Sequence, residues 1–583
     1  MHLSLLALLV ASLTSVAAAQ VTLLKDIRPG RLGSSGTEIV SDGNFAVFAA
    51  NDGGTLGNTV WATNGSPAGT YYLRTGLKNP KWFASTGDKM FFSASDAQNG
   101  QELWVTDGTP SGTVIPKKLM NGLLDSTVAV VTTHEGSVYF FAYGLVNNQR
   151  TLGLWCSDGS ASGTILLKTG TLGFSTSTIA TYWRSASLGK DLYFLNRETG
   201  TGELWKTDGT VAGTQMVFTF NDRAKQISPL IGWKGKVWCD VIQNAKHELW
   251  TSDGTSAGTS FLVNGWAANS MTPADSGDVM YFGFAPSGTG TYTELWKTDG
   301  TLAGTQSITN QVTMLDAPPG HTQGVPLGGR KVFFAGRVGN AMWPFVTDGT
   351  ATGTVQLSST INMWVSPQFG YHIARVGDGS VAVFHSASNM GQELGLTDGT
   401  PQGTKVFDFR PGLSITGMPT WGFVRTRENY VLYFDDGVIG NEPYAIALTW
   451  FGAAFNEQYG TGCSGTNGVP VLRGVGGAPT LGNNNFALEL SNARPNAIAV
   501  LALSPQPAAL TIGPCTILVD IATSILEGRT TDAAGVLRVP VVVPNNASLI
   551  GINVYWQEIV IDPQGSLVSQ FALSNGLRTL VGR

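Results

Sequence analysis

The sequence predicts an all-β protein. We expect a β-propeller of about nine four-stranded blades (eight is the alternative count), closed by an N-terminal strand and followed by a β-sandwich. Three observations lead to this fold. A unit built on Glu-Leu-Trp-x-Thr-Asp-Gly-Thr recurs along the chain, short aromatic segments recur with the same period, and glycine makes up 74 of the 583 residues, which is typical of many tight turns.

Composition and charge narrow the class of protein. Charged residues make up 13% of the chain, about half the usual share, but 42% of the residues are hydrophobic, so we expect a folded chain rather than a disordered one. The formal net charge of −5 argues against a nucleic-acid partner, which would favour a basic surface. A length of 583 residues exceeds one ordinary core and indicates at least two domains.

The N-terminus has the pattern of a secretory signal peptide. Residues 3–10 are apolar, and Ala17-Ala18-Ala19 forms a cleavage site before Gln20. The alternative, an uncleaved membrane anchor, needs an apolar run of about 20 residues. We therefore expect residues 1–19 to be removed. The mature chain, with no membrane span, should be secreted or held at the cell surface or in the periplasm.

The recurring unit defines the blades. Its clearest copies span 102–109, 203–210, 248–255 and 294–301, and degenerate copies span 61–70, 154–164, 345–354 and 393–404. The turn position recurs every 43 to 51 residues, as in propeller blades, at Asn64, Asp107, Asp158, Asp208, Asp253, Asp299, Asp348 and Asp398. Asp accepts hydrogen bonds from its own turn, and Gly supplies the positive φ. Six tryptophans are expected to pack between adjacent blades: Trp61, Trp104, Trp155, Trp205, Trp250 and Trp296.

The aromatic strands outnumber these turns by one. Nine of them end at Phe48, Phe92, Phe140, Phe194, Trp238, Phe282, Phe334, Phe384 and Phe434. The ninth unit continues to a worn Glu-Leu-Trp strand at 441–444 and then lacks a turn and a last strand. Residues 23–30 resemble 406–412, the last strand of the eighth unit with its exit turn. We therefore expect residues 21–27 to complete the ninth blade, which removes two open sheet edges.

The repeated acidic residues are interpreted as structural, because a catalytic group is normally unique in a ring. The alternative for the repeated glutamates is a ring that binds a cation, and they are Glu102, Glu203, Glu248, Glu294, Glu393 and Glu442. The alternative for the turn aspartates is calcium, but calcium needs about six to eight oxygens and one carboxylate supplies too few. We predict no catalytic residue, no metal ligand and no cofactor, with calcium as the alternative.

These motifs resemble the bacterial ELWxxDGT-repeat family (hyalin-like, Asp-box-like) over residues 20–450. The resemblance implies a secreted or surface propeller without an agreed activity. The turn resembles the Asp-box of sialidase-type propellers more loosely, because that box expects a Trp after its Gly, whereas here the Trp precedes the Asp.

Residues 451–583 form a different domain. Few charges occur there, and alternating segments at 486–490, 498–503, 515–520, 536–543 and 550–561 predict a β-sandwich. Cys463 and Cys515 are expected to form a disulfide, which export permits, whereas Cys156 and Cys239 are interpreted as buried thiols. Residues 459–463 and 571–577 resemble a C-terminal module of many secreted bacterial proteins.

No motif of a known catalytic centre is present. The six histidines, His2, His134, His247, His321, His372 and His385, form no H-E-x-x-H pattern, and no G-x-S-x-G elbow occurs. A sialidase-like arginine cluster has candidates by composition alone, namely Arg184, Arg330, Arg337 and Arg375. We therefore predict an exported, non-enzymatic binding or scaffold protein whose propeller faces bind an unidentified glycan or protein. The alternatives are a carbohydrate-active, sialidase-like hydrolase and a calcium-dependent adhesin.

Overall fold

The computed structural model describes residues 21–34, 36–170, 185–196, 202–220, 226–243, 246–267, 271–285, 294–314, 324–339, 341–363, 373–376, 381–388, 391–407, 423–426, 429–435, 439–452 and 454–582. Within these ranges the regular structure is β-strand, apart from the short 3-10 helices η2 (Leu448–Phe451), η3 (Ile521–Thr523) and η4 (Ala547–Leu549). The predicted all-β class is thus confirmed for the described part of the chain. The predicted signal peptide, residues 1–19, lies outside it.

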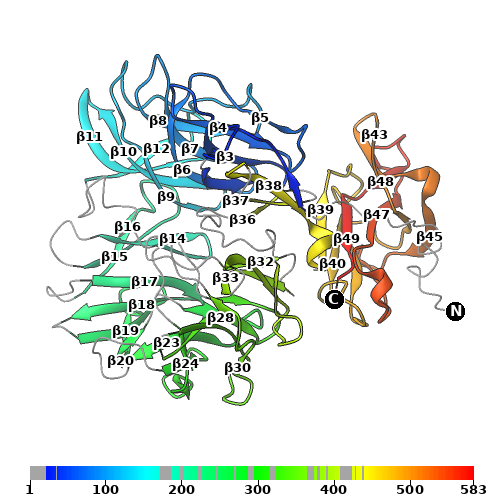
Figure 1. Cartoon of the computed structure of the whole chain (residues 1–583). Helices are drawn as coiled ribbons and strands as arrows, with labels where there is room; N and C mark the ends of the chain where they lie inside the picture. Colours follow the sequence, from blue (N-terminus) through cyan, green and yellow to red (C-terminus); the bar gives the residue numbers. More distant parts are fainter. Residues whose placement is uncertain are drawn as a thin grey trace. The chain divides into compact units, whose positions relative to one another are not determined.

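The chain divides into two compact units (Figure 1). Among the described residues, the first unit comprises those from Val21 to Ile446 apart from Val376 and Val381, and the second comprises those from Ala447 onward together with these two. The boundary expected from the sequence, between residues 450 and 451, falls just inside the second unit. No helix in the described part of the chain has the length and hydropathy needed to cross a bilayer.

Small antiparallel sheets follow one another along the first unit, nine in its described residues. Sheet 1 contains β2 (Thr37–Ser41), β3 (Ala46–Asn51), β4 (Asn58–Thr63) and β5 (Thr70–Tyr72); sheet 2 contains β6 (Lys78–Ser85), β7 (Met90–Ser95) and β8 (Glu102–Thr106); sheet 3 contains β9 (Ala129–His134), β10 (Ser137–Val146), β11 (Gln149–Ser157) and β12 (Ile165–Thr169). Sheet 4 contains β13 (Ser185–Leu188), β14 (Asp191–Asn196), β15 (Glu203–Thr207) and β16 (Gln215–Thr219); sheet 5 contains β17 (Gln226–Trp233), β18 (Lys236–Gln243), β19 (Lys246–Ser252) and β20 (Ser260–Asn264); sheet 6 contains β21 (Trp266–Ala267), β22 (Thr272–Pro273), β23 (Met280–Ala285), β24 (Glu294–Thr298) and β25 (Gln306–Thr309). Sheet 7 contains β26 (Thr313–Met314), β27 (Gly324–Pro326), β28 (Val332–Val338), β29 (Ala341–Thr347) and β30 (Val355–Gln356); sheet 8 contains β31 (Asn362–Met363), β32 (Ile373–Val376), β33 (Val381–Ser388), β34 (Gly391–Thr397) and β35 (Lys405–Phe407); sheet 9 contains β36 (Phe423–Arg425), β37 (Asn429–Asp435), β38 (Asn441–Ala447) and β1 (Val21–Leu23).

The aromatic segment forms an interior strand of each sheet. In sheet 2 this strand is β7, Met-Phe-Phe-Ser-Ala-Ser, and its first five residues are buried, because sheets cover it on both faces. The next strand carries Glu-Leu-Trp, and its Trp104 lies directly opposite Phe92 with the two rings stacked 6.5 Å apart. The same register joins Phe140 with Trp155 and Phe194 with Trp205.

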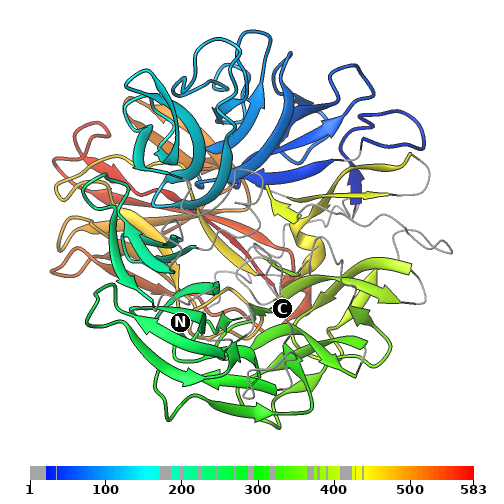
Figure 2. The ribbon, with the colours of Figure 1, turned by 90° about the vertical axis from the view of Figure 1, so that its left-hand side faces the viewer.

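Sheet 9 joins the two ends of the first unit (Figure 2). Its outer strand β1 pairs antiparallel with β38, with Val21 opposite Ile446 and Leu23 opposite Tyr444. The chain continues this pairing by one further bond, from Leu24 N to Pro443 O at 2.9 Å. The N-terminal segment therefore supplies the fourth strand that the ninth repeat lacks.

Neighbouring sheets share hydrophobic cores. Val47 and Val60 of sheet 1 pack with Phe92 of sheet 2 in one core. Phe48 of sheet 1 packs with Tyr433 of sheet 9 in another, at a ring-centroid distance of 5.4 Å. Each large side chain buried in this way contributes about 1.5–3 kcal/mol. The first and last sheets are thus held together by the same kind of packing that joins sheets adjacent in sequence.

The second unit has two sheets and a hairpin. The larger sheet has the order β39-β49-β47-β42-β45 with β48 beside β47, the smaller has the order β40-β41-β46, and β43 pairs with β44. Their bounds are β39 (Phe455–Tyr459), β40 (Val471–Val475), β41 (Ala487–Ser491), β42 (Ile498–Ser504), β43 (Pro507–Ile512), β44 (Cys515–Val519), β45 (Ile525–Thr530), β46 (Leu537–Pro540), β47 (Asn553–Ile561), β48 (Phe571–Leu573) and β49 (Gly576–Leu580). One core contains Leu488 and Val539 from the smaller sheet and Leu501 and Trp556 from the larger.

The predicted disulfide is present in the second unit. Cys463 is bonded to Cys515 at the start of β44, with 5.1 Å between their Cα atoms. It connects the segment after β39 to the β43–β44 hairpin. Cys156 and Cys239, in the first unit, are buried free thiols.

Candidate functional site

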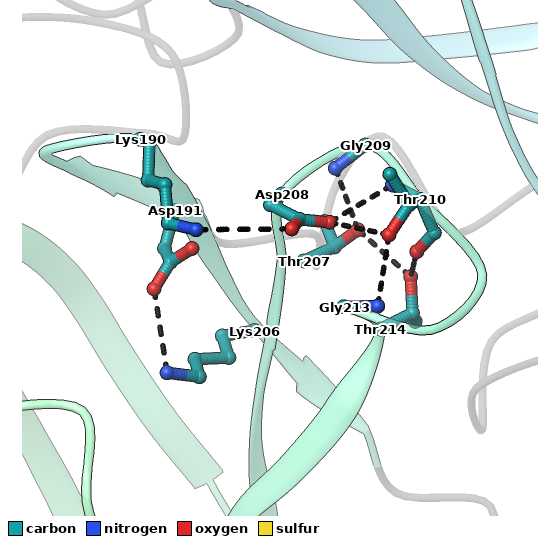
Figure 3. Close-up of polar contacts among 9 residues, drawn as sticks. All are labelled: Lys190, Asp191, Lys206, Thr207, Asp208, Gly209, Thr210, Gly213 and Thr214. Carbon is teal, nitrogen blue, oxygen red and sulfur yellow. Dashed lines mark hydrogen bonds and ion pairs between the residues drawn. The ribbon is translucent and has the colours of Figure 1, made fainter.

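Side-chain hydrogen bonds hold the repeated turn between the third and fourth strands of a sheet (Figure 3). Asp208 Oδ1 accepts hydrogen bonds from the Thr210 amide at 3.0 Å and from the Thr210 hydroxyl at 2.7 Å. That hydroxyl accepts a bond from Gly213 N at 2.9 Å, and the Thr207 hydroxyl accepts one from Gly209 N at 3.1 Å. The bonds from Thr210 hold the pKa of Asp208 below its ordinary value.

The other turn residues named from the sequence repeat this arrangement. Each accepts the backbone N–H two residues further on, at Asn64, Asp107, Asp158, Asp253, Asp299, Asp348 and Asp398. A Cβ at Gly213 would lie 1.9 Å from Asp208 Oδ1, so the second glycine of the unit leaves the space that the carboxylate occupies. The turn carboxylates thus bond within their own turns. In the described part of the chain, no three His, Cys, Asp or Glu side chains are grouped so that they could hold a metal ion.

The repeated glutamate bonds within the fold in two different ways. Glu102 accepts the amides of Leu119 and Met120, at 3.3 and 3.1 Å, on the segment that leads to the next sheet. In sheets 4, 5 and 6 the glutamate accepts the indole N–H two residues later, as Glu203 does from Trp205 at 2.8 Å. Burial raises the pKa of Glu102.

Glu442, in the worn repeat of sheet 9, bonds as Glu102 does but to the other end of the chain. Its carboxylate accepts the amides of Ile27 and Arg28, each at 3.1 Å, and the hydroxyl of Ser34 at 2.7 Å. Glu442 is fully buried, and burial raises its pKa. The segment after β1 therefore occupies, beside sheet 9, the place that Leu119 and Met120 occupy beside sheet 2.

The six tryptophans named from the sequence have hydrogen-bond partners for their indole N–H groups. Trp205, Trp250 and Trp296 are half-buried and donate to the glutamate of their own strand. The others are buried and donate elsewhere: Trp61 to the Thr59 hydroxyl, Trp104 to Ala94 O and Trp155 to Ala142 O. These contacts hold the rings at the faces of their sheets.

The arginines considered for a sialidase-like cluster bind carboxylates or a backbone carbonyl. Arg330 pairs with Asp278, and Arg375 pairs with Asp275 at 2.8 Å, so both contact the turn before β23. Asp275 also accepts Gly328 N at 2.9 Å. Arg337 donates to Gly339 O, away from this turn, and Arg184 lies outside the described residues.

The described histidines lie on three different strands. His2, His321 and His372 lie outside the described residues, His247 lies in β19 and His385 is buried in β33. His134 ends β9 of sheet 3 and is 7% exposed. Its Nδ1 lies 2.9 Å from Ser187 Oγ, on β13 of the next sheet.

Ser187 and His134 bring a hydroxyl and an imidazole together between two sheets. Ser187 is exposed, whereas His134 is buried. No group in the described residues bonds His134 Nε2. When the proton is on Nε2, Nδ1 can accept the proton of the serine hydroxyl. Sequence reasoning did not single out this pair, because 53 residues separate its members and neither belongs to a known motif.

No protein-family model matches this chain, and no curated protein matches it. Solved structures do. One comes from a structural and mechanistic analysis of two prolyl endopeptidases, with 10% identity, a TM-score of 0.32, and coverage of 82% of this chain and 55% of that one. Another is a Mycobacterium tuberculosis puromycin-hydrolyzing peptidase, with 9% identity, a TM-score of 0.36, and coverage of 71% and 60%. This chain thus spans little more than half the length of the structures it matches.

These comparisons correct the predicted function. The sequence led to a non-enzymatic binding or scaffold protein, or alternatively to a sialidase-like hydrolase or a calcium-dependent adhesin, whereas both solved structures are peptidases. We withdraw those predictions. They rested on the regularity of the repeat, which bears only on residues that recur, and Ser187 and His134 lie outside the repeated unit. TM-scores of 0.32 and 0.36 assign no activity to this chain.

Proposed function

We propose that this protein hydrolyses carboxylic esters or amides, with Ser187 as the nucleophile and His134 as its general base. The observation that carries this proposal is the 2.9 Å contact between Ser187 Oγ and His134 Nδ1. A serine hydroxyl is a weak nucleophile until a neighbouring base takes its proton, and that transfer needs a separation of about 2.6–3.2 Å. The exposed position of Ser187 leaves room for a substrate carbonyl.

The proposed reaction has two steps. Ser187 Oγ attacks the carbonyl carbon while its proton passes to His134 Nδ1, and the departing alcohol or amine then takes that proton. Water next gives a proton to His134 and its oxygen attacks the acyl carbon. The carboxylic acid leaves as Ser187 Oγ regains the proton. No described carboxylate bonds His134 Nε2 to orient the ring, so we expect a slower enzyme than one with a complete triad.

The proposal is tested with a fluorophosphonate probe, which labels activated serines, on the full-length protein. We expect mass spectrometry to find the label on Ser187 and Ser187→Ala to abolish it. His134→Ala should slow labelling about 10²- to 10⁴-fold, the usual contribution of a general base. Ser185→Ala, on the same strand, is the matched control and should label normally. An unlabelled wild-type protein, or equal labelling of Ser187→Ala, would falsify the assignment.

The nine sheets of the first unit are proposed to be the blades of a closed β-propeller. Three contacts support closure: β1 pairs with β38, Glu442 bonds the segment after β1, and Asn429 of sheet 9 donates to Gly65 O in the turn of sheet 1 at 2.9 Å. Lys89 of sheet 2 makes the equivalent contact with Asp158 O in the turn of sheet 3. The two sheets that share a core in the second unit support a β-sandwich.

Export and family membership are also part of the proposal. We take residues 1–19 as a signal peptide, 20–450 as the propeller of an ELWxxDGT-repeat protein and 451–583 as the sandwich. The Cys463–Cys515 disulfide supports export, because such bonds persist in oxidising compartments. Sequencing the N-terminus of secreted protein tests this: Gln20 should be the first residue, and retention of Met1 would contradict it.

A further inference from the structure

Glu558, in the second unit, is a buried acid in an apolar core. It lies on β47 and is 1% exposed. Its alternating neighbours on the same face, Trp556 and Val560, belong to the core between the two sheets. The residue directly opposite on β42 is Leu501, which belongs to the same core. The Glu558 side chain therefore lies between the sheets rather than on the outer surface.

Neither carboxylate oxygen of Glu558 has a hydrogen-bond partner in the described residues. The backbone of Glu558, in contrast, makes two hydrogen bonds with Ser574. Glu558 N donates to the Ser574 hydroxyl at 2.9 Å, and Ser574 N donates to Glu558 O at 3.0 Å. The backbone is thus held in place. An ionised carboxylate without donors is costly in such a site, whereas a protonated one is tolerated.

The charged groups that face Glu558 come from β45, the edge strand of the larger sheet. Glu527 is opposite Leu501 on β45, and Arg529 is two residues further along the same face. These two form an ion pair with each other, and both are about one-third exposed. On the smaller sheet, Arg473, Glu489 and Arg538 are paired in register on the face away from the core, because Leu472, Leu488 and Val539 occupy the core face.

We propose that Glu558 is a pH-sensitive switch for the β45 edge of the second unit. With Glu558 protonated, Arg529 pairs with Glu527 and β45 stays paired with β42. When the proton is lost to solvent, the new carboxylate requires a cation or water, and Arg529 is the cation within electrostatic reach. Arg529 bonds Glu527 through Nη2 and leaves its Nε without a partner among the described residues, so its turn toward the new carboxylate disturbs the pair that it makes on β45, and the edge opens.

The direction of the effect follows from proton binding. Burial, opposed by Arg529 and assisted by the like charge of Glu527, raises the pKa of Glu558 to about 8 from an ordinary 4.5. Between these two values the closed unit holds one more proton than the open one. The closed state is therefore most favoured at acidic pH, and the equilibrium for closing falls roughly tenfold per pH unit until the pH passes the pKa of the closed state.

The test is hydrogen–deuterium exchange of the full-length protein between pH 6 and pH 9. Peptides covering β45 and β47 should lose protection in the wild type relative to Glu558→Gln at each pH, roughly tenfold per unit up to about pH 8 and no further. Glu489→Gln, on the outer face, is the matched control and should follow the wild type. Parallel curves for the wild type and Glu558→Gln would overturn the proposal.

A second variant keeps the proposal testable if Glu558→Gln does not fold. Glu527→Gln removes the like charge and leaves Arg529 free to pair with Glu558, so the pH at which the loss of protection levels off should move to a lower value. An unchanged or higher value would also overturn the proposal.

Discussion

One of the contacts that support the proposed closure of the first unit is made by a buried carboxylate, that of Glu442, and the substitution Glu442→Gln tests its contribution. Glutamine keeps the shape and one acceptor oxygen but places an NH₂ group against one of the three donors on Ile27, Arg28 and Ser34. A hydrogen bond to a charged acceptor contributes about 1.5–3 kcal/mol, and a buried donor left unpaired costs about 1–3 kcal/mol. We expect a net loss of about 2–4 kcal/mol, concentrated on residues 21–34, because the remaining contacts of sheet 9 are unchanged.

Hydrogen–deuterium exchange of the full-length protein measures this loss where it occurs. A cost of about 2–4 kcal/mol corresponds to a roughly 30- to 1,000-fold faster exchange of peptides within residues 21–34. Glu102→Gln is the matched control, because its carboxylate bonds Leu119 and Met120 in the same manner but within a continuous chain. Exchange in that variant should rise around residues 117–122 and leave 21–34 protected. If Glu442→Gln leaves 21–34 as protected as in the wild type, the assigned role of this carboxylate is wrong.

Two further perturbations address the turn and the disulfide. Gly213→Ala places a Cβ 1.9 Å from Asp208 Oδ1, so the two hydrogen bonds from Thr210 should be lost at a cost of about 1–3 kcal/mol. The loss should appear as faster hydrogen–deuterium exchange of residues 207–214, with substitution of the exposed Val211 by Ala as the control. Unchanged exchange in Gly213→Ala would show that the turn adapts to the added Cβ. The double substitution of Cys463 and Cys515 to Ser opens a loop of 52 residues and should destabilise the second unit by about 4 kcal/mol in calorimetry, while a transition at the wild-type temperature would contradict this.

The repeat was predictable because its contacts are local. Asp208 accepts hydrogen bonds from Thr210, and the Thr210 hydroxyl accepts one from Gly213 N, so one short string contains the groups that form the turn. The repeated glutamate nevertheless has different hydrogen-bond partners in different sheets. The glutamate of sheet 4, Glu203, accepts from Trp205, and that of sheet 2, Glu102, accepts from Leu119 and Met120.

The candidate site could not be predicted in the same way. Ser187 and His134 are 53 residues apart, and their contact depends on how sheet 3 packs against sheet 4. The prediction of a non-enzymatic protein was based on the repeated carboxylates. Recurring residues carry no information about Ser187 and His134, because neither belongs to the repeated unit.

The pattern of residues alone was enough to establish the all-β class, the positions of the turns, the incomplete ninth repeat with its N-terminal complement, and the Cys463–Cys515 pair. These depend on periodicity, on turn chemistry within eight residues and on resemblance between segments. Only the tertiary structure decided that Ser187 lies against His134 and that Glu558 is buried without a donor. Both result from packing between strands distant in sequence, and a side chain's protonation and reactivity depend on the neighbours that such packing brings to it.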